Sequence, residues 1–140
     1  MKARIKWLDG SSFEAESDSG HTLLIDGPPD HGGRNLGMRP MEAVLIGLGS
    51  CSAFDVVSIL RKSRQQVTGC HVELDAERAT TVPAVFTRIH MHYVVRGHAV
   101  KPAAVQRAVK LSVDTYCSAT AMLKPHVEIT HDWRIEDDMD

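Results

Sequence analysis

The chain has 140 residues, a length that fits one domain, and we expect a single domain over residues 1–140. A domain of this size can bury a core without disulfide bonds. The formal net charge is −2, with acidic and basic residues interspersed, which argues against the strongly basic surface of a nucleic-acid-binding protein.

Apolar and charged residues alternate along the first 26 residues, which predicts β-strands. The predicted strands are residues 3–8, 13–17 and 21–26. Short turns separate them, so we expect an antiparallel meander. Residues 27–37 are rich in glycine and proline and are long for a connection in a compact domain, which indicates a functional loop.

The longest apolar run follows this loop and predicts the central helix. Pro40 suits the first turn of a helix, and Lys62 and Arg64 suit its last turn. The run is about long enough to cross a bilayer. Asp55 lies inside it, however, and a charge there costs roughly 2.5–3.5 kcal/mol on insertion scales. We therefore expect a fully buried helix of a soluble protein and no membrane partner.

The second half of the chain alternates strands with helices. The predicted elements are strands over 68–81 and 86–96, a helix opening at 101–102, a short helical turn over 117–123 and a strand over 127–135. The order βββ-α-ββ-αα-β predicts an α+β domain.

The sequence carries no phosphate loop, dinucleotide glycine fingerprint, zinc-protease motif, Cys-x-x-Cys or nucleophile elbow. We therefore expect no cofactor. No signal-peptide pattern opens the chain, because the basic N-terminal residues are not followed by an apolar segment. The expected location is the cytoplasm, where thiols are kept reduced.

The eight histidines suggest a metal site. His90 and His92 would share one face of a strand, and a third ligand would have to be His71 or His131. The alternative, which we favour, is that they are polar residues on the solvent face of a sheet, with no bound metal. Cys70 is interpreted as a small buried residue.

Cys51, in the central helix, and Cys117, after the second helix, are the leading functional candidates. Two thiols on separate helices can form a redox pair, and the alternative is two small core residues. Gly47 removes side-chain bulk one helical turn before Cys51, which would let a substrate or a packing partner approach closely.

The helix dipole, a carboxylate and nearby cations bear on whether Cys51 is ionised, since the thiolate is the reactive form. A helix break at residues 47–49 would place Cys51 in a first turn, whereas an unbroken helix gives it little help from the dipole. Asp55, one turn later, would raise the pKa of a thiol. Arg34 and Arg39 are the candidate cations, and the alternative is that they are solvated loop charges.

With this element order, four segments resemble the OsmC/Ohr organic-hydroperoxide reductases, and the YhfA-like branch most closely. The segments are residues 40–42, 49–51, 55–60 and 116–118. The resemblance implies an OsmC/Ohr-like α+β fold with an antiparallel sheet wrapped on central helices. It also implies an intertwined homodimer with active sites at the interface.

The resemblance further implies thiol peroxidase chemistry in oxidative-stress defence. Cys51 would attack an organic hydroperoxide and become a sulfenic acid, and Cys117 would resolve it as a disulfide that a dithiol reductant reopens. The alternative is a protein of the same fold that binds a small ligand or senses oxidation slowly, without efficient turnover.

One position departs from the pattern of that family. Met41 stands where the resemblance implies a glutamate that helps an arginine to activate the thiolate. Glu42 is no simple substitute, because nine residues before Cys51 place it about 180° away around a regular helix.

Overall fold

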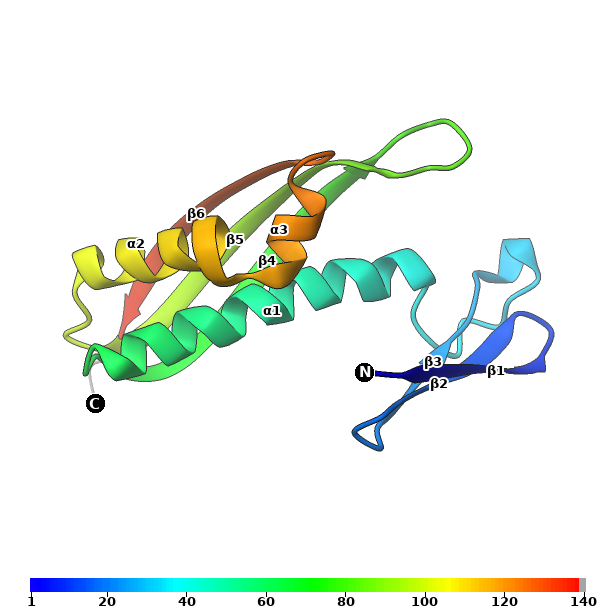
Figure 1. Cartoon of the computed structure of the whole chain (residues 1–140), viewed down its shortest axis with the longest axis horizontal. Coiled ribbons are helices and arrows are strands. Elements are labelled where there is room, and N and C mark those ends of the chain that lie inside the picture. The colour runs from blue at the N-terminus through cyan, green and yellow to red at the C-terminus, as the bar shows by residue number, and fades with distance from the viewer. Residues whose placement is uncertain (139–140) are drawn as a thin grey trace. The chain divides into compact units, whose positions relative to one another are not determined.

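The computed structural model describes residues 1–138 and divides the chain into two compact units (Figure 1). The N-terminal unit is Met1–Ile46, and the second unit begins at Gly47. The helix α1, Pro40–Lys62, runs from the first unit into the second.

The N-terminal unit contains the predicted meander. Its strands are β1 (Ala3–Asp9), β2 (Ser12–Ser17) and β3 (Thr22–Ile25), hydrogen-bonded antiparallel in that order. Opposite charges face each other in the register, as at Lys6 and Glu14. Such cross-strand pairs favour this register over its neighbours.

The glycine-rich loop of the N-terminal unit is organised by one buried carboxylate, Asp26. Its oxygens accept hydrogen bonds from the backbone N–H groups of Gly27 at 2.7 Å, Leu36 at 3.2 Å and Arg34 at 3.3 Å. Burial opposes ionisation, but these donors and the hydroxyl of Ser12 outweigh it, so the pKa of Asp26 lies below its ordinary value. The loop is therefore ordered around a charge and includes a 3₁₀ turn, Pro29–His31.

Helix α1 is unbroken from Pro40 to Lys62. The side chain of Glu42 accepts a hydrogen bond from the Arg39 N–H at 2.8 Å, which caps the start of the helix. Gly47 and Gly49 do not interrupt it, so the alternative with a helix break is excluded.

The prediction that α1 is fully buried is wrong for this chain. One face is buried in the second unit, and Leu48, Val56 and Leu60 lie on it. Phe54 on another face is 78% exposed. The described residues contain one helix, α1, that is long and apolar enough to span a membrane by length and composition, a test that core helices of soluble proteins also pass.

The second unit is built on a three-stranded sheet of mixed direction. Its strands are β4 (Gln66–Arg78), β5 (Phe86–His98) and β6 (Glu128–Asp137), in the order β4-β5-β6. The hairpin β4–β5 is antiparallel, whereas β6 pairs with β5 in parallel. The expectation of an antiparallel sheet is therefore wrong for this edge, because a helical crossover returns the chain to the start of β5 before β6 begins.

That crossover contains three helical segments. They are α2 (Pro102–Leu111), a π-helix η2 (Ser112–Tyr116) and α3 (Ser118–Leu123). Figure 1 shows them on the same side of the sheet as α1. This side contains the buried core residues of β5 and α2, among them Ile89, Met91, Tyr93, Val105 and Val109.

Candidate active site

Cys51 lies in the interior of α1 and is half-buried. Because the helix begins eleven positions earlier, at Pro40, the positive end of its dipole is too far away to stabilise a thiolate at Cys51. Cys51 is thus partly exposed, in contrast to the buried core residues of the same helix.

Cys117 lies where the π-helix η2 meets α3 and is 2% exposed. Its sulfur caps α3 by accepting a hydrogen bond from the Thr120 N–H at 3.4 Å. Burial raises the pKa of the Cys117 thiol, the N–H and hydroxyl of Thr120 partly oppose that rise, and Cys51 adds to it. The buried cysteine is therefore held as a thiol.

The two thiols are neighbours in the second unit. Cys51 is one of the neighbours that raise the pKa of the Cys117 thiol, so the two side chains lie close together. A half-exposed thiol thus lies directly beside a buried one, although the two are far apart in sequence. Both are free thiols in this structure.

A chain of buried hydroxyl groups adjoins the thiol pair, and sequence reasoning missed it. Ser52 bonds the phenol of Tyr93 at 2.6 Å and the hydroxyl of Ser112 at 2.8 Å. The Ser112 hydroxyl also donates to the carboxylate of Asp55 at 3.1 Å. The available signal was Ser52 itself, a polar residue four positions from both Leu48 and Val56 on the buried face of α1.

Asp55, a predicted supporting residue, lies one helical turn after Cys51 and is half-buried. Its described hydrogen bond comes from Ser112, so it connects α1 to η2. A carboxylate in this place does not favour an adjacent thiolate.

The predicted arginines, Arg34 and Arg39, belong to the N-terminal unit, where both guanidinium groups have partners. Arg34 pairs with Asp9. Arg39 donates to the side-chain oxygen of Asn35 at 2.8 Å and to the carbonyl of Gly37 at 3.1 Å. Their role as activators of Cys51 stays a prediction.

The histidines of β5 lie on the sheet face opposite the helices. His90 and His92 both contact the same carboxylate oxygen of Asp132, at 2.9 and 2.7 Å. These two contacts hold the pKa of Asp132 below its ordinary value. Among residues 1–138, no three His, Cys, Asp or Glu side chains are placed to hold a metal ion.

Cys70, in β4, is half-buried, and burial raises the pKa of its thiol. It lies opposite Val95 in the β4–β5 ladder.

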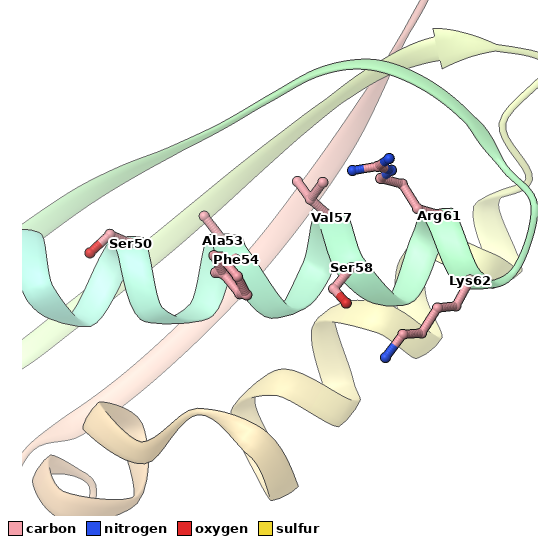
Figure 2. Close-up of a pocket in the computed structure, with 7 residues that line it drawn as sticks. All are labelled: Ser50, Ala53, Phe54, Val57, Ser58, Arg61 and Lys62. Carbon is pink, nitrogen blue, oxygen red and sulfur yellow. The ribbon is translucent and has the colours of Figure 1, made fainter.

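An open groove runs along α1 from Ser50 to Lys62 (Figure 2). Its floor is apolar, and two cations, Arg61 and Lys62, lie at its C-terminal end. The residues that line it are Ser50, Ala53, Phe54, Val57, Ser58, Arg61 and Lys62.

Comparisons with known proteins agree with this architecture. Residues 31–132 match the family model described as OsmC-like protein, a match that spans both units. The chain is 48% identical to the protein YhfA of Escherichia coli K12 over 138 residues, covering 96% of this chain and 98% of YhfA.

Solved structures show the same fold. A hypothetical protein from Aquifex aeolicus is 30% identical, with a TM-score of 0.86 over 98% of this chain and 96% of that one. The organic hydroperoxide resistance protein OsmC of Legionella pneumophila has a TM-score of 0.71 over 94% of each chain, at 13% identity. The latter similarity concerns the fold alone.

Proposed function

Because this chain belongs to the OsmC-like protein family, we propose that it is a thiol-dependent peroxidase that reduces organic hydroperoxides through Cys51 and Cys117. The observation that carries the proposal is the adjacency of the two thiols, one half-exposed and one buried. Fold relatives named as organic hydroperoxide resistance proteins support the substrate class.

The first step takes place at the accessible sulfur. The thiolate of Cys51 attacks the terminal oxygen of ROOH, the O–O bond breaks, and the leaving alkoxide takes up a proton as the alcohol ROH. Cys51 is thereby oxidised to a sulfenic acid. Accessibility assigns this step to Cys51, because Cys117 is 2% exposed.

The second step uses the buried sulfur. The sulfur of Cys117 displaces the sulfenic oxygen of Cys51, so that an S–S bond forms and an S–O bond breaks. The oxygen leaves as water with the proton of Cys117. A dithiol reductant then reopens the disulfide by exchange and restores both thiols.

The proposal includes a homodimer in the cytoplasm. The exposed apolar groove of α1 supports a second copy as its cover, because a large apolar patch on a soluble chain is usually an interaction surface. A closed dimer would also place apolar residues around Cys51, which favours an organic hydroperoxide over hydrogen peroxide. Neither a membrane nor a nucleic acid is part of this proposal.

The test is reductant-coupled consumption of cumene hydroperoxide by the full chain. We expect turnover with a dithiol reductant that is lost in Cys51→Ser. Cys117→Ser should oxidise once, to a sulfenic acid, and then stop. Cys70→Ser, which removes the thiol outside the pair, is the matched control and should turn over like the unmodified protein.

A second function is favoured by the surroundings of Cys51. The helix is unbroken before it, Asp55 follows one turn later, and Met41 stands where a glutamate was expected. These features suit a slow redox sensor or a small-ligand-binding protein. A single stoichiometric oxidation without turnover, in protein whose thiols all titrate, would favour it and overturn the peroxidase.

A further inference from the structure

The two cysteines lie on segments that no backbone ladder joins. Cys51 is in α1, and Cys117 follows the π-helix η2 in the crossover between β5 and β6. Their mutual position therefore depends on side-chain contacts between α1 and η2. A π-helix is rare and often lies at a functional site.

Ser112, the first residue of η2, makes contacts on both sides of this junction. Its hydroxyl contacts three atoms of α1: the Ser52 hydroxyl oxygen at 2.8 Å, an Asp55 carboxylate oxygen at 3.1 Å and the Ser52 carbonyl oxygen at 3.4 Å. Its own carbonyl accepts the Cys117 N–H at 2.8 Å. One residue thus connects the segment next to Cys51 with the backbone of Cys117.

The buried hydroxyl groups donate their protons in one direction, from Tyr93 toward Asp55. The phenol of Tyr93 has one proton to donate, and the Ser52 hydroxyl at 2.6 Å is a closer acceptor than the sulfur of Met91 at 3.7 Å. Asp55, as a carboxylate, can only accept. Each hydroxyl between them has one proton, so the shortest contacts give Tyr93 to Ser52, Ser52 to Ser112, and Ser112 to Asp55.

Burial makes this arrangement hard to replace. Tyr93, Ser52 and Ser112 are each 0% exposed. Water cannot take the place of a lost partner there without new space, and an unpaired buried hydroxyl is costly. The hydrogen-bonded hydroxyl groups therefore hold α1, η2 and β5 in one relative position.

We propose that Ser112, hydrogen-bonded to Ser52, is a positioning residue that holds the sulfur of Cys117 in place to close the disulfide with Cys51. This inference rests on the proposed function and deepens it. Ser112 touches none of the reacting atoms and acts through the backbone of Cys117. It governs the second step, in which the S–S bond forms and water leaves, and not the attack on the peroxide.

The test separates the two steps in the full-length protein. After rapid mixing with cumene hydroperoxide, sulfenic acid at Cys51 is trapped with dimedone, and disulfide is measured by mass spectrometry. In Ser112→Ala we expect closure to slow by about tenfold or more, because alignment of reacting groups is lost. Formation of the sulfenic acid should stay within about twofold of the unmodified protein.

A double-mutant cycle tests the pairing with Ser52. Ser52→Ala should slow closure like Ser112→Ala, and the double variant should slow it no further than the slower single variant. Fully additive effects would show that the two hydroxyls act separately, and would overturn the proposal.

Two controls separate positioning from lost stability. Ser63→Ala removes a hydroxyl just after α1 whose described hydrogen bond goes to the Ile59 carbonyl, and it should leave both steps unchanged. Ile89→Val shortens a buried side chain of β5 that has no hydroxyl group. Equal slowing in Ile89→Val and Ser112→Ala, or closure at the unmodified rate in Ser112→Ala, would overturn the proposal.

A peroxide-free measurement keeps this proposal distinct from the proposed function. The equilibrium between the Cys51–Cys117 dithiol and glutathione disulfide reports on how well the sulfurs are placed. We expect the equilibrium constant for the protein disulfide to fall about tenfold in Ser112→Ala. If the protein does not reduce peroxide but this shift is seen, the peroxidase fails and the positioning role stands; an unchanged constant overturns the positioning role.

Discussion

The polar side chains buried beside the cysteine pair carry neutral hydroxyl groups, those of serine, threonine and tyrosine. The phenol of Tyr93 keeps its proton because burial penalises the charged form. Burial acts in the same direction on Cys117. The buried groups of the site therefore stay protonated. Cys51 is the more exposed of the two sulfur-bearing residues.

Asp26 provides the opposite case, a buried group whose charge is favoured. Asp26→Asn would place an amide N–H₂ group against backbone donors, since Asp26 Oδ2 accepts from Arg34 and Leu36. We expect the variant to unfold at a lower temperature at neutral pH. Asp30→Asn changes an exposed carboxylate of the same loop and should have no effect.

The stability that the Asp26 carboxylate contributes to the fold should decrease at acidic pH. The folded-state pKa of Asp26 lies below the unfolded value of about 4, so its contribution is present above that value and is lost as the pH falls through the folded-state pKa. We expect the difference in thermal stability between the unmodified protein and the Asp26→Asn variant to shrink below about pH 4. Thermal unfolding from neutral to strongly acidic pH measures it, and a constant difference would contradict this role.

At the scale of elements, the hairpin β4–β5 depends on one close backbone approach. A Cβ at Gly97 would overlap the carbonyl of Gln66, which is backbone and cannot rotate away. At Gly69, in the same ladder, a Cβ would meet only the side chain of Arg96, with the Cβ–Cβ distance an ordinary 3.5 Å.

These two glycines make a matched pair of variants. Gly97→Ala should lower the free energy of unfolding by about 1–3 kcal/mol or more, as overpacking does. Gly69→Ala should be neutral or stabilising by up to about 0.5–1 kcal/mol, because alanine restricts the unfolded chain. Urea denaturation measures both free energies of unfolding. Equal effects would show that the close approach of Gly97 to Gln66 does not decide the cost of an added Cβ.

The elements themselves were largely readable from the sequence. Period-2 alternation identified the strands, and Pro40 and Pro102 open the two long helices as predicted. The π-helix Ser112–Tyr116 was missed, because its sequence has the same local preferences as an ordinary helix end. The parallel pairing of β6 was missed too, because strand direction depends on where the crossover ends in space.

At the scale of the whole molecule, the main feature is the apolar face of α1. Only 28% of its most apolar window is buried within the chain. Phe54 lies on the exposed side, in the groove of Figure 2. In a symmetric dimer, one interface would cover this face on both copies of the chain.

Phe54→Glu tests the dimer. We expect the unmodified protein to sediment as a dimer without detergent, and the variant to dissociate, losing about 2 kcal/mol or more as at interface hot spots. Val85→Glu changes another exposed apolar residue, in the β4–β5 connection, and should remain dimeric. A monomeric unmodified protein, or a dimeric Phe54→Glu variant, would contradict the α1 interface.

The sequence by itself determined the α+β class, the strand meander, the central helix and the family, because local periodicity and motif spacing are properties of the chain. It also singled out Cys51 and Cys117. Their adjacency, the exposure of one and burial of the other, and the hydroxyl chain through Ser112 were decided only by tertiary structure. Each depends on contacts between residues about 40 to 65 positions apart, as between Ser52 and Tyr93 or Ser112.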